Sequence, residues 1–209
     1  MPALESRLLI VTDRQQTKGR PLVSLLTEAV KAGNPTIQIR ERDLCAKDLL
    51  ALAEELLTVA RRRRSQLLIN DRLDVALSLD GVGVHLRSNS LPVSVARRII
   101  GRHRLLGASV HSVSEAIHAQ DGGADYVVLG PIYETPSKQP YGPPLGLSTL
   151  EEAVRVVRVP IIGIGGVTAV RARDIRAAGA FGVAVVTAVL GADDVHAATR
   201  ALLDAVTSS

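Results

Sequence analysis

Residues 160–191, which read PIIGIGGVTAVRARDIRAAGAFGVAVVTAVLG, decide the fold. The stretch contains two short apolar runs, 161–164 and 181–186, with a helical pattern at 170–178 between them. Apolar runs of strand length on either side of one helix are typical of a strand–helix–strand unit with buried, parallel strands. The stretch therefore predicts an α/β protein built on a parallel sheet.

Both apolar runs end at residues that leave the backbone accessible. Gly165 and Gly166 follow the first run, and Val186 and Thr187 end the second. Backbone N–H groups at neighbouring strand ends suit a phosphate group, especially where a helix begins. We expect these four residues to bind phosphate; the simpler alternative is that the glycines only make a tight turn.

The same unit repeats along the whole chain. Strands are expected at 8–11, 36–39, 67–69, 82–86, 105–109, 125–129, 161–164 and 181–186, and helices at 22–32, 47–62, 72–78, 90–100, 114–121, 148–157, 170–178 and 193–206. Eight such units predict a single (β/α)8 TIM barrel over residues 1–209, with the phosphate site at the ends of strands 7 and 8. An open doubly wound sheet is the alternative, but it would favour a glycine-rich turn after the first strand, where this chain has Thr12 and Asp13. Asp43 is the expected N-cap of the helix at 47–62.

Composition narrows the class of protein. Apolar residues make up 46% of the chain and aromatic residues only 2%, which predicts an aliphatic core and argues against single-stranded nucleic-acid binding. The net charge of +4 fits a small anionic substrate. The single Cys45 excludes an internal disulfide, and no apolar run is long enough to span a membrane. We expect a cytoplasmic protein without nucleic-acid or membrane partners, and leave a homo-oligomer open.

Polar residues follow the predicted strands. In a barrel, the carboxyl ends of all strands meet at one mouth, so these side chains are candidate site residues. They are Asp13, Gln38, Arg40, Arg42, Asn70, Asp71, Ser88, Ser109, His111, Thr135, Ser137, Lys138, Gly166 and Thr187. Arg40 and Arg42 are two residues apart and are expected on one side of the strand, where arginine pairs well with planar oxyanions. The long loop at 130–146 is expected to be functional.

Several motifs resemble one family in order and spacing: IQIRER at 37–42, INDRLDVAL at 69–77, GVHL at 83–86, GPIYETPSK at 130–138, IGIGGV at 162–167 and AVVTAV at 184–189. They are similar to thiamine phosphate synthase and to its relative, the thiazole tautomerase TenI. The resemblance implies a (β/α)8 barrel acting on a small phosphorylated thiazole. The synthase joins a pyrimidine pyrophosphate to thiazole phosphate with Mg²⁺ and releases pyrophosphate, whereas TenI aromatises a thiazole carboxylate phosphate by proton transfer without a metal.

For the synthase, the resemblance assigns substrate-binding positions to Gln38, Arg40, Asn70, Ser109, Thr135, Ser137 and Lys138, and a Mg²⁺ ligand to Asp71. Three positions depart from the synthase pattern. Arg42 replaces a lysine, Arg87 replaces a glycine, and Ser90 replaces a second metal-binding aspartate. Because Mg²⁺ prefers carboxylate oxygens, the lost carboxylate at Ser90 and the added cation at Arg87 are expected to weaken a metal site, whereas Arg42 is a milder change of one cation for another.

For the tautomerase, the resemblance rests on SVHS at 109–112, LRSNS at 86–90 and YET at 133–135. It makes His111 the proton-transfer residue, and histidine suits that role because it both gives and accepts a proton near neutral pH. His85 lies inside a predicted strand and is expected in the core. We expect a TenI-like thiazole tautomerase, an isomerase that needs no cofactor. The alternatives are a thiamine phosphate synthase, which is a transferase with Mg²⁺, and a non-catalytic phosphate-ligand binding or regulatory protein.

Overall fold

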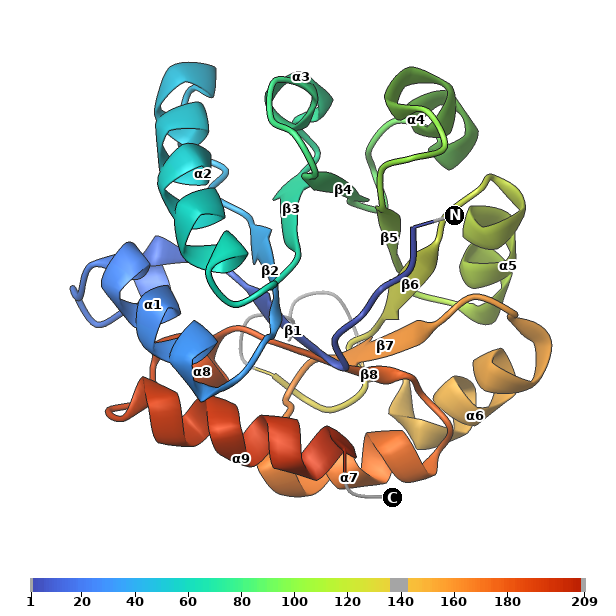
Figure 1. Ribbon diagram of the computed structural model, residues 1–209. Helices are drawn as coiled ribbons and strands as arrows, with labels where there is room; N and C mark the ends of the chain where they lie inside the picture. Colours follow the sequence, from blue (N-terminus) through green and yellow to red (C-terminus); the bar gives the residue numbers. More distant parts are fainter. Residues whose placement is uncertain (1, 136–142, 208–209) are drawn as a thin grey trace.

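The computed structural model describes residues 2–135 and 143–207. Eight parallel strands pair in sequence order and close into a barrel, since β8 pairs with β1 (Figure 1). The strands are β1 (Leu8–Val11), β2 (Thr36–Ile39), β3 (Leu67–Asn70), β4 (Gly83–Leu86), β5 (Leu106–Val110), β6 (Tyr126–Leu129), β7 (Ile161–Ile164) and β8 (Gly182–Val185). The predicted (β/α)8 barrel is confirmed.

Helices surround the barrel and connect its strands (Figure 1). They are α1 (Leu22–Ala32), α2 (Ala46–Arg61), α3 (Leu73–Leu77), α4 (Val93–Ile100), α5 (Val113–Asp121), α6 (Gly146–Val156), α7 (Ala169–Ala177), α8 (Thr187–Leu190) and α9 (Val195–Thr207), with a short 3-10 helix η1 (Arg14–Gln16) after β1. None of the helices in these described ranges is long and apolar enough to cross a membrane.

The predicted cap of α2 was wrong. Cys45 occupies the N-cap position and makes no side-chain cap hydrogen bond. The carboxylate of Asp43 instead accepts a hydrogen bond from Arg14 Nη2 at 2.8 Å. A tertiary ion pair with the β1 end therefore holds the side chain that local sequence assigned to the helix.

The core has two layers because each strand alternates its side chains between two faces. On β1, Leu8 and Ile10 belong to the large cluster between sheet and helices, while Leu9 and Val11 belong to a smaller cluster inside the barrel. Tyr126 is a fully buried aromatic residue of that inner cluster, and the partly buried Phe181 packs against it. Both layers are mainly aliphatic, as the composition predicted. Side chains of the inner layer fill the barrel interior beneath the mouth.

Candidate active site

A buried amide pair lies at the ends of β2 and β3. Gln38 Nε2 donates a hydrogen bond to Asn70 Oδ1 at 3.0 Å, and both side chains are buried. Ile39 on β2 is in register with Ile69 on β3, which brings the two amides to neighbouring strand ends. Sequence reasoning named both residues, and the structure brings them together.

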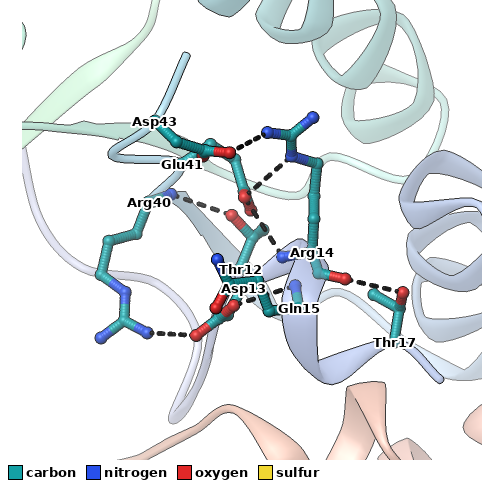
Figure 2. A network of polar contacts seen from close by, with 8 residues as sticks. All are labelled: Thr12, Asp13, Arg14, Gln15, Thr17, Arg40, Glu41 and Asp43. Atoms are coloured by element: carbon teal, nitrogen blue, oxygen red, sulfur yellow. Dashed lines mark hydrogen bonds and ion pairs between the residues drawn. The ribbon is translucent and has the colours of Figure 1, made fainter. Parts of the chain in front are cut away.

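Arg40 follows Gln38 just beyond the end of β2. Its backbone N–H donates to Thr12 Oγ1 at 2.9 Å, and its Nη2 donates to Asp13 Oδ2 at 3.2 Å (Figure 2). Burial lowers the pKa of the Arg40 guanidinium, and the positive charge of Arg42 lowers it further. A bound anion would offset both effects, so Arg40 is suited to hold an anionic ligand.

Glu41 points to the opposite side and anchors this strand end. Its Oε2 accepts hydrogen bonds from Arg14 N and Arg14 Nε, both at 3.1 Å, and Arg14 also binds Asp43 (Figure 2). β2 ends at Ile39, so Arg42 lies in an exposed turn after the strand. The prediction that Arg40 and Arg42 share one side of a strand is therefore wrong in geometry, although their charges still interact.

Asp71 is paired with Arg87 across the ends of β3 and β4. Asp71 Oδ1 accepts a hydrogen bond from Arg87 N at 3.0 Å, and Asp71 Oδ2 forms an ion pair with Arg87 Nε. The backbone of Asp71 has a positive φ of 62°, and its N–H donates to His85 O at 2.9 Å. Both carboxylate oxygens are thus engaged by a single residue.

This arrangement does not fit a magnesium site with two carboxylates. Asp71 is already neutralised by a guanidinium, and Ser90 supplies a hydroxyl where a second carboxylate would be needed. Residues 2–135 and 143–207 contain no group of three His, Cys, Asp or Glu side chains that could hold a metal ion. Mg²⁺ prefers an oxygen cage with carboxylate charge, which these residues do not provide.

A buried chain of polar groups runs beneath the mouth. His85 Nδ1 is 2.9 Å from the Tyr126 hydroxyl, and His85 Nε2 is 2.9 Å from Ser109 Oγ. Burial lowers the pKa of His85 to about 4 and raises that of Tyr126 above its usual range. His85 is therefore a neutral core residue at pH 7, as predicted from its strand position, and it supports Ser109. Sequence reasoning missed Tyr126. It could have been noticed as an isolated aromatic residue at the start of a predicted strand in a chain with few aromatic residues.

His111 follows β5 and is exposed. Its Nδ1 lies 2.6 Å from Gly130 O, and its backbone N–H donates to Glu115 Oε2 at 2.8 Å. A carbonyl oxygen only accepts, so Nδ1 carries the proton and Nε2 of the neutral ring is the acceptor. The Nδ1 contact orients the imidazole, and the Glu115 contact holds the backbone of His111.

Two glycines follow β7 and have left-handed backbone conformations. Gly165 has φ 100° and Gly166 has φ 62°, and a Cβ on Gly166 would lie 2.6 Å from Glu134 O. The loop after β6 therefore packs directly against them. Val186 precedes α8, which begins at Thr187, so the first N–H groups of this helix lack intrahelical acceptors.

The site residues after β6 lie only partly within the described chain. Thr135 is half-buried, at the end of the described range. Ser137 and Lys138 lie outside the described residues.

The fold and the polar residues at the carboxyl ends of the strands define a (β/α)8-barrel protein of the kind that binds small molecules at this mouth. The thiamine monophosphate synthase family matches residues 8–189, and the chain belongs to this family. The thiamine-phosphate synthase of Roseiflexus sp. strain RS-1 is 44% identical over 96% of this chain and 85% of its own. That of Methanoculleus marisnigri is 43% identical over 97% of this chain and 96% of its own. A solved structure, thiamine phosphate pyrophosphorylase from Pyrococcus furiosus, has 34% identity and a TM-score of 0.87 over 96% of this chain and 95% of its own.

These relatives contradict the tautomerase and isomerase prediction. That prediction rested on three short motifs, one of which, LRSNS, places Arg87 beside the carboxylate of Asp71. The relatives named as synthases match across nearly the whole chain. The departures at Arg87 and Ser90 therefore do not outweigh the similarity of nearly the whole chain to the synthases.

Proposed function

We propose that this protein is a thiamine-phosphate synthase, a transferase that joins a pyrimidine pyrophosphate to a thiazole phosphate and releases pyrophosphate. The observation that carries the proposal is the 44% identity to a thiamine-phosphate synthase over 96% of the chain. The arginines at the strand ends, Arg40, Arg42 and Arg87, support it, because both substrates are anionic.

The residues at the mouth divide into two groups in this proposal. Gln38, Arg40 and Asn70 bind the pyrimidine pyrophosphate, and Arg42 adds positive charge from the exposed turn after β2. The half-buried Arg40 stabilises the charge that develops as pyrophosphate leaves. Ser109 orients the pyrimidine, supported by His85. Three residues of the loop after β6 are assigned to pyrophosphate binding: Thr135, Ser137 and Lys138.

The thiazole phosphate is assigned to the ends of β7 and β8, the location at which this fold commonly binds phosphate. Gly165 and Gly166 let the backbone approach the phosphate closely, and Val186 and Thr187 present N–H groups at the start of α8. The proton-transfer role expected for His111 belonged to the tautomerase and is not part of this proposal. Neither is a Mg²⁺ step, because the donor set around Asp71 does not fit that ion.

The test is a coupling assay with both substrates, in which thiamine phosphate and pyrophosphate are quantified with and without Mg²⁺. We expect the two products in equal amounts. Arg40→Met should reduce kcat/KM by about 100-fold, since a charge-assisted contact to the leaving group is lost. Arg98→Ala is the control, because this exposed arginine lies in the last turn of α4, away from the mouth. A folded wild type that forms no product under either condition would overturn the proposal.

A further inference from the structure

Arg87 is placed where it can act on a ligand as well as on Asp71. Its contacts to Asp71 use the backbone N–H and Nε, so neither terminal Nη group of the guanidinium takes part in them. The Arg87 side chain is 40% exposed, whereas that of Asp71 is only 13% exposed. The less exposed carboxylate of Asp71 therefore orients a guanidinium whose terminal nitrogens are accessible at the ends of β3 and β4.

The positions of the charges connect Arg87 to the rest of the mouth. Asn70 on β3 is in register with His85 on β4, and Gln38 Nε2 on β2 donates to Asn70 Oδ1 at 3.0 Å, so the ends of these three strands lie side by side. Each of the three charged residues directly follows one of these strands: Arg40 follows β2, Asp71 follows β3 and Arg87 follows β4. Arg40 and Arg87 thus provide two cations for one polyanionic ligand.

The backbone holds this pair in place. Asp71 has a left-handed φ of 62°, a conformation that is unfavourable for a residue with a Cβ and persists where surrounding contacts fix it. Its N–H is bound to His85 O, and Ser90 N donates to Arg87 O at 3.1 Å, closing a turn after β4. A metal ion could bind Asp71 only by displacing Arg87 from its carboxylate. The backbone hydrogen bonds of Asp71 and Arg87 hold the two residues in this contact.

We propose that Arg87 takes the place of a divalent cation at this mouth and binds the pyrophosphate group of the substrate directly through its terminal nitrogens. The proposal rests on the proposed function. In the coupling step, the bond between the pyrimidine-bearing carbon and the pyrophosphate oxygen breaks, its electron pair goes to that oxygen, and the carbon gains its new bond from the thiazole. The guanidinium stabilises the negative charge on the departing group without transferring a proton.

The first test measures binding of inorganic pyrophosphate by calorimetry in the presence of EDTA. Wild type should bind, and Arg87→Ala should weaken binding by about 10-fold or more, because a bidentate guanidinium contact is lost. Arg87→Lys keeps the charge but not the fork and should give an intermediate affinity. Arg98→Ala, the matched exposed arginine, should bind as wild type does. Metal-free wild type that does not bind, or Arg87→Ala that binds equally well, would overturn the proposal.

The second test measures Mn²⁺ binding by electron paramagnetic resonance. The double variant Arg87→Gly/Ser90→Asp frees Asp71 and adds a second carboxylate, so it should bind Mn²⁺ about 10-fold or more tightly than wild type does. Equal affinities would contradict the proposal. Both tests are independent of coupling activity. Metal-free pyrophosphate binding without product formation would count against the proposed function alone, whereas product formation that requires Mg²⁺ would count against the role of Arg87 alone.

Discussion

At the residue scale, burial sets the charge of His85 and links the stability of the barrel to pH. The folded-state pKa of about 4 lies below the ordinary value of 6.5. The unfolded chain therefore binds more protons between these two values, and stability falls as pH decreases through that window. Between pH 7.5 and pH 5, His85 should account for a loss of about 2 kcal/mol in the free energy of unfolding.

Urea unfolding of wild type and His85→Gln across this range measures that contribution. Glutamine keeps hydrogen-bonding capacity without titrating, so the difference between the two curves isolates His85 from the carboxylates. The variant should lose about 2 kcal/mol less than wild type on going from pH 7.5 to pH 5. Parallel curves would mean that His85 is protonated in the folded protein near its ordinary pKa.

Sequence alone placed individual residues at the mouth but did not predict the ion pair between Asp71 and Arg87. Gln38, Asn70 and Ser109 could be placed at the mouth because each is the last or second-last residue of a strand, and all parallel strands end at one side. The ion pair of Asp71 with Arg87 could not be derived in this way, since it depends on the left-handed backbone of Asp71. The missed contact decides whether that carboxylate faces a metal or an arginine.

At the element scale, the start of α5 connects helix capping to the position of His111. Ser112 Oγ accepts from Glu115 N at 3.1 Å, and Glu115 Oε2 accepts from His111 N. Ser112→Ala should lower the free energy of unfolding by about 1 kcal/mol, because a backbone N–H in the first turn loses its acceptor. Ser114→Ala, two residues later on the same helix, should change it by less than about 0.5 kcal/mol. Chemical denaturation compares the two variants, and equal losses would contradict a capping role for Ser112.

Strands and helices could be predicted because each is marked by a pattern of apolar residues within its own stretch of sequence. The apolar runs marked every strand because both faces of a barrel strand are buried. The cap of α2 failed because Arg14, from a different strand end, competes for Asp43. Local sequence indicates which residues are able to cap a helix, and tertiary contacts decide whether they do.

At the scale of the whole molecule, closure depends on the seam between β8 and β1. Val183 N donates to Arg7 O at 2.8 Å, and a Cβ on Gly182 would overlap that same carbonyl group. Gly182→Ala should therefore destabilise the barrel by about 2–3 kcal/mol, since the clash is with backbone that cannot move without loosening the seam. Gly33→Ala is the control, because its Cβ would meet only the end of the flexible Leu203 side chain and should have a smaller effect.

Closure of the barrel couples the stability of its strands. Each strand pairs with two neighbours in a closed ring, so weakening one seam should lower the stability of all strands together. Urea unfolding of Gly182→Ala, followed by far-UV circular dichroism and by tyrosine fluorescence, should give coincident transitions at a lower urea concentration than wild type. Separate transitions would mean that β1 and β8 detach while the rest of the barrel persists, and the mouth would then be held by an open sheet.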